Sequence, residues 1–385
     1  MRCSTAAGLA SALVLVTMST AAPSANAEST PVSSKQVAST ACAGTLYLSV
    51  KGSGEKGPEG AILPAFRTAI TSQIPGTVTS MYLDYPAIST QVLSQKDLED
   101  YLLDDRPLNS SFFASVSAGA AELTRVLDHV HTACPEQKVV VVGFSQGSDV
   151  VTAVLARAPQ AQWITASLLI GNPSHYPGQA IRERDGQVDT PAFGMQSLLD
   201  YLHQRQATRS SDRRGRLDQV LRDVFSLHSG QVDNAAIENA MSGTASYLPA
   251  TDYARTFSLC AQGDAVCDFA PAMSRLLSSS SSLDDEINRA RPVHGGYRPE
   301  DATRTIDTLL QVVDPTRRSA ATPGNPTIPL ESPSTSPTPA PAKEPVIRVT
   351  SPATSAGTSW RTAGALAVAT LLLGAVGGWL LGRRR

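Results

Sequence analysis

The sequence predicts an α/β fold in which helices cover both faces of a mostly parallel sheet. Two observations predict it. Apolar runs of strand length alternate along the chain with segments of helical periodicity, as in βαβ units. The apolar runs are also nearly continuous, which is typical of strands buried on both faces. We expect the globular domain to span residues 38–314, an acceptable length for one α/β domain.

The expected elements follow one another in this alternating order. A first strand at residues 45–50 ends at a glycine-rich loop, and a second ends at an Asp-Tyr-Pro turn. A helix is expected at residues 115–134 because Val116, Ala120, Leu123 and Leu127 share one face. The other expected strands and helices lie at residues 62–74 (helix), 78–83 (strand), 138–142 (strand), 148–156 (helix) and 163–170 (strand).

Residues 174–252 form an expected helical insert near the carboxyl edge of the sheet. Helices are expected at residues 190–206 and 216–227, with a highly charged stretch between them. The insert could be a lid, a substrate wall or a solvated surface excursion. Its apolar residues could line an acyl channel, but packing of a helix face on the core is the commoner arrangement and the one we favour. These residues are Phe193, Met195, Leu198, Leu199 and Tyr201.

The start of the chain predicts export. Residues 1–27 combine a basic start, an apolar stretch and an Ala-Asn-Ala end, which are typical of a signal peptide and its cleavage site. Cleavage would remove Cys3 and leave Cys42, Cys134, Cys260 and Cys267. An even number of cysteines in an exported protein favours two disulfides, although four cysteines allow three connectivities.

The end of the chain predicts a membrane anchor. Residues 315–359 are rich in Pro, Ser and Thr and should form an extended stalk. Residues 363–381 carry no charge, and as a helix they would span about 28 Å. The basic tail at 382–385 should stay cytoplasmic, so the domain should face outward.

Composition limits the possible partners. A net charge of −2 gives no indication of nucleic-acid binding. The sequence has neither a metal-ligand cluster nor a phosphate-cradling glycine loop, so we expect no metal and no cofactor. It does not predict the oligomeric state.

The strongest chemical signal is the G-x-S-x-G motif centred on Ser145. It follows the apolar run at residues 138–142 and precedes an expected helix, which is the setting that a nucleophile elbow requires. The two glycines relieve crowding at a sharp turn that holds the serine oxygen at its tip. The backbone amide of Gln146 could then donate to an oxyanion.

A serine nucleophile needs a base and an acid. In the scaffold that carries a nucleophile elbow, the acid follows the serine along the chain and the histidine follows the acid. His294 lies in an expected loop tip before a helix, whereas His228 ends a helical pattern and His175 precedes any good acid. For the acid, Asp264 lies in a loop that a disulfide between Cys260 and Cys267 would close. Asp268, one residue outside that loop, is the rival acid. From the residues alone, Asp264 is explained equally well as part of an ordinary turn.

Several motifs together resemble the cutinase family of serine esterases, within the α/β-hydrolases. The resemblance covers residues from Cys42 to Tyr297 and rests on five features: Lys51-Gly52-Ser53, Tyr85-Pro86-Ala87, Cys134 shortly before the G-F-S-Q-G elbow, the C-x-x-G-D-x-V-C loop, and His294 with Tyr297. It implies a three-layer fold with a serine triad. The implied residues are Ser145 as nucleophile, Asp264 as acid, His294 as base, Ser53 and the Gln146 amide as oxyanion donors, and the pairs Cys42–Cys134 and Cys260–Cys267.

The sequence departs from that family in its expanded insert and its anchor, which suggest an enzyme kept near its own envelope, as in actinobacterial relatives. We expect hydrolysis of medium-chain or envelope lipid esters through an acyl-enzyme. An acyltransferase or a phospholipase or thioesterase acting on envelope lipids is an alternative. A tethered surface-binding protein with a relic triad is another.

Overall fold

The computed structural model of the chain describes residues 30–89, 100–104, 111–179, 181, 185, 192–207, 212–269, 271–272, 275, 280–281 and 283–317. The expected signal peptide, all but the first three residues of the expected stalk, and the expected span at 363–381 with its tail lie outside these residues. In the described ranges, no helix is both long enough and apolar enough to cross a membrane.

A six-stranded parallel sheet forms the middle layer, in the order β1-β3-β2-β4-β5-β6. Its strands are β1 (Val32–Ser33), β2 (Thr45–Val50), β3 (Val78–Tyr82), β4 (Lys138–Phe144), β5 (Ala166–Ile170) and β6 (Thr256–Leu259). The parallel sheet is confirmed, as are the four expected strands. The edge strands β1 and β6 were not expected, and β1 precedes the expected domain start at residue 38.

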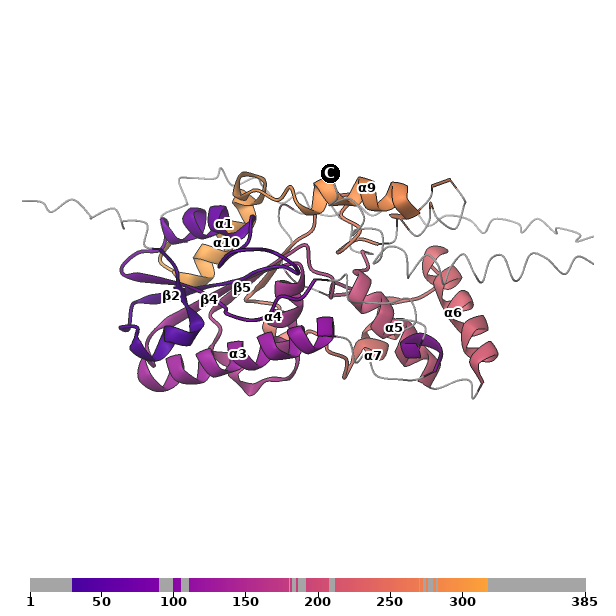
Figure 1. Cartoon of the computed structure of the whole chain (residues 1–385), viewed down its shortest axis with the longest axis horizontal. Coiled ribbons are helices and arrows are strands. Elements are labelled where there is room, and N and C mark those ends of the chain that lie inside the picture. The colour runs from indigo at the N-terminus through magenta and orange to yellow at the C-terminus, as the bar shows by residue number, and fades with distance from the viewer. Residues whose placement is uncertain are drawn as a thin grey trace, which may run out of the picture.

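Helices cover both faces of the sheet (Figure 1). One face carries α1 (Leu63–Thr71) and α10 (Thr303–Val313), and the other carries α3 (Ser111–Ala133) and α4 (Gln146–Arg157). Alternate residues of β4 supply the two apolar cores. Val139 and Val141 point to the α3 side, while Val140 and Val142 point to the α1 side. The central strand is therefore apolar on both faces, as its run of valines predicts.

The insert packs on a core of its own beside the sheet (Figure 1). Its helices are α5 (Met195–Ala207), α6 (Arg213–His228) and α7 (Asn234–Met241). The third helix was not expected; the Asp233 carboxylate caps it by accepting from Ala236 N at 2.6 Å. Four of the five apolar side chains considered for an acyl channel are buried in this third core, and Met195 packs against it. The favoured packing interpretation is confirmed.

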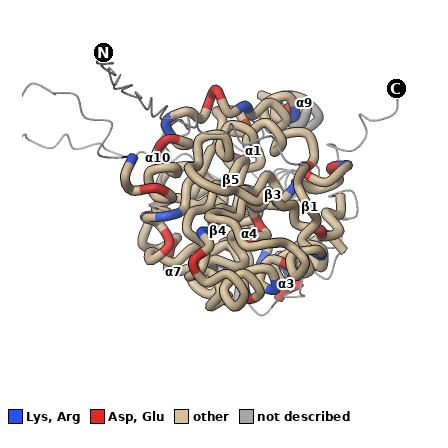
Figure 2. The backbone as a smooth tube through the Cα atoms, turned by 90° about the vertical axis from the view of Figure 1, so that its left-hand side faces the viewer, with Lys and Arg blue, Asp and Glu red and all other residues tan. Residues whose placement is uncertain are grey.

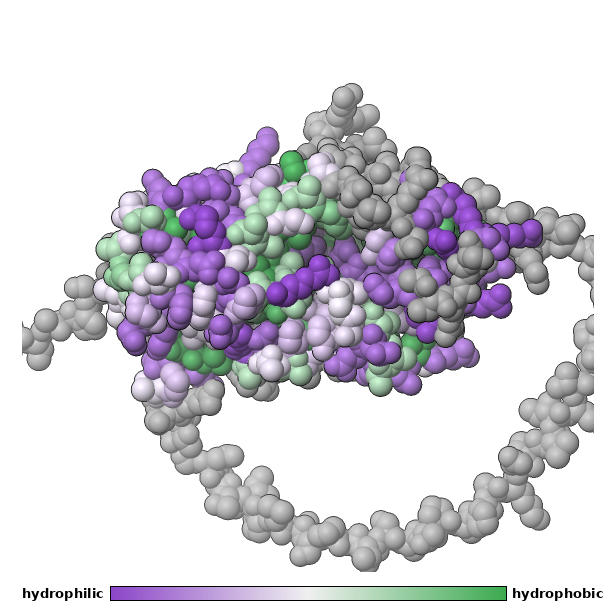
Figure 3. Space-filling model, turned by 90° about the horizontal axis from the view of Figure 1, so that it is seen from below, coloured by the Kyte–Doolittle hydropathy of each residue, from purple (hydrophilic) through white to green (hydrophobic). Residues whose placement is uncertain are grey.

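An open groove of about 710 Å³ separates the insert from α3 and α4. Ala121 of α3, Arg157 of α4 and His203 of α5 line it, with Thr244 after α7. Figure 3 shows the side of the molecule on which α3 lies, where apolar, weakly polar and strongly hydrophilic residues are mixed in the middle of the face. The groove reaches α4 at its carboxyl end, which is opposite the end where Ser145 lies.

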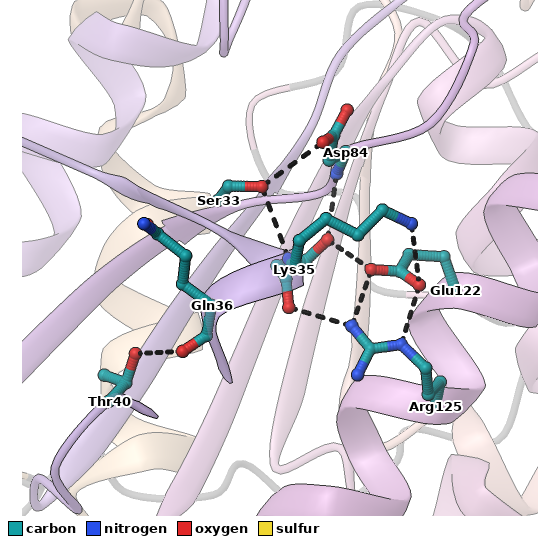
Figure 4. Close-up of polar contacts among 8 residues, drawn as sticks. Ser33, Lys35, Gln36, Thr40, Asp84, Glu122 and Arg125 are labelled. Carbon is teal, nitrogen blue, oxygen red and sulfur yellow. Dashed lines mark hydrogen bonds and ion pairs between the residues drawn. The ribbon is translucent and has the colours of Figure 1, made fainter. Parts of the chain in front are cut away.

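A polar cluster ties the amino-terminal segment to α3 (Figure 4). Ser34, at the start of the 3-10 helix η1 (Ser34–Ser39), donates to Glu122 Oε1 at 2.5 Å and accepts from Asp84 N at 3.0 Å. Although burial raises the pKa of Glu122, hydrogen bonds from Arg125, Ser34 and Lys35 bring it down to about 2. The remaining charges are interspersed along the chain (Figure 2), as the small net charge suggests.

The two disulfides pair as the family resemblance implies. Cys42 and Cys134 are joined with their Cα atoms 5.6 Å apart, just ahead of the neighbouring strands β2 and β4. Cys260 and Cys267 close a short loop directly after β6. Two disulfides in one domain are typical of proteins that fold outside the reducing cytosol.

Candidate active site

The expected nucleophile elbow forms between β4 and α4. Ser145 has φ 54° and ψ −121°, and it is one of two described non-glycine residues with positive φ. Both flanking glycines are required, because a methyl group at Gly143 would lie 2.6 Å from the carbonyl oxygen of Gly147. One at Gly147 would lie 1.9 Å from the carbonyl oxygen of Val50. The close packing at both glycines holds this strained turn in place.

A buried hydrogen-bonded pair lies at the same edge of the sheet. The His294 ring, through Nδ1, bonds Asp264 Oδ2 at 2.8 Å, and the two side chains are 6% and 0% exposed. Asp264 also accepts from Val266 N at Oδ1 and from the Tyr297 hydroxyl at Oδ2, at 3.0 and 2.6 Å. Of the two rival carboxylates, Asp264 is the one hydrogen-bonded to the His294 ring.

The expectation that His294 lies in a loop is wrong, because His294 is the last residue of α9 (Leu283–His294). The helix continues through Pro292, and it ends only where Gly295 and Gly296 follow. Gly295 N still donates to Arg291 O at 3.0 Å. Proline removes a single N–H from the helix, and here that loss does not end it.

The end of β5 contacts both the elbow and the His294 ring. Ser145 N donates to Ile170 O at 2.9 Å, and a methyl group at Gly171, the next residue, would lie 2.9 Å from His294 Cε1. Phe144, directly before the serine, stacks on the His294 ring with centroids 4.9 Å apart. Phe144, directly before Ser145, and Gly171, directly after β5, thus border the His294 ring that bonds Asp264.

The two candidate oxyanion residues come from neighbouring segments. Ser53 follows β2 and is 6% exposed, and Gln146 opens α4 and is 1% exposed. A methyl group on Gly52 would lie 3.2 Å from Ser145 Cβ, so the loop that carries Ser53 packs directly on the nucleophile turn. The Gln146 side chain points away from that role, since its Nε2 donates to Ile88 O at 3.2 Å.

The other histidines considered take different places. His175 is buried beneath α5, and burial lowers the pKa of its ring to about 4. Its carbonyl accepts from Gly194 N at 2.8 Å, and its Nδ1 finds no partner among the described residues. His203 of α5 is half-buried and stacks on Tyr101 with centroids 4.0 Å apart. His228 ends α6 as expected.

Sequence reasoning missed three residues that support the site. Tyr297 bonds Asp264; the family resemblance includes it three residues after the histidine but gives it no role. The Tyr85 hydroxyl donates to Lys51 O at 2.5 Å. The Glu55 carboxylate accepts from Gly52 N at 2.7 Å. Tyr85 lies in a motif that carried the family resemblance, and Glu55 lies two residues after another, but no spacing rule assigns either of them a contact.

Solved structures of several esterases are similar to this chain. The catalytic core domain of acetyl xylan esterase from Trichoderma reesei has 15% identity and a TM-score of 0.40, covering 70% of this chain and 98% of its own. A cutinase-like protein from Cryptococcus sp. has 17% identity and a TM-score of 0.37, covering 67% and 100%. Trichoderma reesei cutinase in complex with a C11Y4 phosphonate inhibitor has 17% identity and a TM-score of 0.35, covering 71% and 78%.

No curated protein sequence matches the chain. The family model described as Cutinase matches residues 41–276, well over half of the chain. The matched range includes β2 to β6, the elbow and the loop of Asp264. The chain therefore belongs to the cutinase family of carboxylic ester hydrolases.

Proposed function

We propose that the protein is a serine esterase that cleaves carboxylic esters through an acyl-enzyme on Ser145. His294 takes the proton of the Ser145 hydroxyl as that oxygen attacks the ester carbonyl. The protonated ring then gives this proton to the departing alcohol, and the same base activates the water that releases the acid. Asp264 holds the imidazole in one tautomer and offsets its positive charge.

The observation that carries the proposal is the buried hydrogen bond between His294 Nδ1 and Asp264 beside a strained serine. An Nδ1–H that donates to a carboxylate leaves Nε2 as the basic nitrogen. The Phe144 ring lies against the imidazole. Burying a carboxylate is unfavourable unless it is hydrogen-bonded, and the three donors to Asp264 meet that need.

Ser53 and the backbone amide of Gln146 are the proposed oxyanion donors. A backbone amide at the amino end of α4 faces developing negative charge with the favourable end of the helix dipole. The loss of one such donor typically lowers kcat by about 10²–10³. The packing of the 51–53 segment on the elbow supports the pairing of these two donors.

The proposed substrates are medium-chain or envelope lipid esters, and the proposed place is the outer side of the cell membrane. The two disulfides agree with an exported domain. The predicted stalk and span motivate the tether, and a tether of that length favours substrates within the organism's own envelope. We do not propose that the acyl chain of the substrate binds in the apolar core of the insert, because the side chains of that core pack on one another.

The test is the full-length chain and its Ser145→Ala variant, assayed on p-nitrophenyl esters of increasing acyl length. The wild type should turn over and label with a fluorophosphonate at Ser145, and the variant should do neither. A wild type that fails to label would indicate a relic site, and undiminished turnover by the variant would refute the nucleophile. Ester formation with added glycerol or sugar would instead identify acyl transfer.

A further inference from the structure

The loop that carries Ser53 is folded around one carboxylate. Glu55 Oε2 accepts from Gly52 N at 2.7 Å, and its Oε1 accepts from Ala61 N at 2.9 Å. One side chain thus bridges the two ends of a ten-residue turn. Gly60, at φ 72°, makes room for it, because a methyl group there would lie 2.1 Å from Oε2.

The position of Gly52 determines where Ser53 lies relative to the nucleophile. The Gly52 backbone packs on the elbow, since an added methyl group would lie 2.9 Å from the Phe144 ring and 3.2 Å from Ser145 Cβ. Ser53 is the next residue along the chain. A shift of Gly52 away from this contact would move the proposed oxyanion donor with it.

Other contacts hold the loop on either side of Gly52. The Tyr85 hydroxyl donates to Lys51 O at 2.5 Å, and Gly54 N donates to Ala87 O at 2.7 Å. Ala87 itself has a φ of 46°, the other described non-glycine residue with positive φ. The amide of Gly52, between these two anchors, is held by Glu55.

A carboxylate is an unfavourable group to place near a developing oxyanion, because the two negative charges repel. The number of hydrogen bonds that a carboxylate can accept explains why Glu55 occupies this position. The two backbone amides that converge on this side chain need two acceptor oxygens, and an ionised carboxylate offers both. A glutamine of the same shape offers one acceptor, and its NH₂ group would face the second amide as donor against donor.

We propose that Glu55 is a positioning residue, whose carboxylate fixes the oxyanion loop against the nucleophile elbow. The inference rests on the proposed function, since it concerns the donor from Ser53 to an oxyanion formed on Ser145. Glu55 acts on the transition state through the backbone and does not touch the ester. It should therefore affect kcat and leave ground-state binding of a small ester nearly unchanged.

The test compares Glu55→Gln with the wild type in the full-length chain, using a short p-nitrophenyl ester. We expect kcat to fall by about 10- to 100-fold, the effect of displacing or losing one donor. KM should stay within about threefold. The rate of fluorophosphonate labelling should fall in parallel with kcat, because the phosphonyl oxygen uses the same donors. Glu55→Asp, which keeps two acceptor oxygens, should retain more of kcat than Glu55→Gln.

Glu136→Gln is the matched control, because Glu136 is exposed in the turn that leads into the amino end of β4, at the opposite edge of the sheet. It should behave as the wild type. The proposal is wrong if Glu55→Gln keeps kcat within twofold of the wild type. It is also wrong if Glu55→Gln loses its near-UV circular dichroism, because Glu55 would then be needed for the fold itself. Active Ser145→Ala would refute the esterase mechanism, whereas inactive Ser145→Ala with fully active Glu55→Gln would refute only the positioning role.

Discussion

Removal of the Tyr297 hydroxyl is the sharpest test of how the acid is held. This hydroxyl donates to Asp264 Oδ2 at 2.6 Å and accepts from Ala261 N at 3.0 Å. The side chain is 7% exposed, so water replaces neither bond easily. Tyr297→Phe keeps the ring packed edge-on against Phe144 and deletes both bonds at once.

The magnitude follows from the two lost bonds. A hydrogen bond to a charged group contributes about 1.5–3 kcal/mol, and a buried amide left unpaired costs about 1–3 kcal/mol. Partial relaxation of the loop makes about 2–4 kcal/mol a reasonable total for the drop in unfolding free energy. In a domain of this size that corresponds to a fall in Tm of roughly 5–15 °C.

The effect on kcat should be smaller than that of removing the acid. Asp264 keeps its bonds to His294 and Val266 N, so we expect kcat to fall about tenfold. Loss of the acid itself lowers kcat about 10⁴-fold in the well-studied serine triad. Differential scanning calorimetry and steady-state kinetics on one preparation measure both effects.

Tyr47→Phe is the control for this experiment. Tyr47 is fully buried in β2, and its hydroxyl has no hydrogen-bond partner among the described residues. Its removal should leave Tm and kcat near their wild-type values. If Tyr297→Phe matched Tyr47→Phe in both measurements, the hydroxyl would not hold Asp264 and the reasoning above would fail.

Two further predictions concern a buried acid and the disulfides. Burial raises the pKa of Asp149 from 3.8 to about 8, so the folded state favours the protonated acid. The free energy of unfolding should therefore fall as the pH rises from about 4 to about 8, by up to about 1.4 kcal/mol per pH unit. Asp149→Asn should flatten this slope in urea titrations at pH 5 and 8; an unchanged slope would contradict it. Replacing Cys260 and Cys267 by serine should lower the free energy of unfolding by about 2–3 kcal/mol and should also lower kcat. Cys42 and Cys134 are 92 residues apart in the sequence, so replacing them should lower the free energy of unfolding by about 4–5 kcal/mol and leave kcat unchanged below Tm. Equal losses of kcat in the two double variants would show that the short loop does not orient Asp264.

The central strands and the elbow could be predicted because their signals are local. The valines of β4 are apolar on both faces, and the G-x-S-x-G motif carries its own steric requirement. Strand β6 gave no such signal, because Thr256–Leu259 is four residues long and half polar. Its pairing with β5 makes it a strand, and that partner lies far away in the sequence.

The sequence narrows the candidates for the base and the acid to a few residues, but it does not predict their positions in the fold. Asp264 and Asp268 lie four residues apart, the first inside the Cys260–Cys267 loop and the second just after it, and contact with α9 distinguishes them. The helical state of His294 depends on the residues before Pro292 and on the glycines after it, which a proline-based boundary rule misjudges. The contacts of Glu55 likewise depend on how the loop closes, which no residue spacing encodes.

Three carboxylates lie around the elbow, and their partners separate their roles. Glu55 is held by two backbone amides, and Asp149 accepts from the Ser174 hydroxyl at 2.6 Å. Neither set of partners includes a group that acts as a base near neutral pH, so these two carboxyl groups hold the chain in place and orient no base. Asp264 alone of the three is bonded to an imidazole, the side chain that takes up and releases protons in that range. The same chemical group thus holds two backbone amides at Glu55, binds a buried hydroxyl at Asp149 and is the partner of an imidazole at Asp264, and the difference lies in what donates to it.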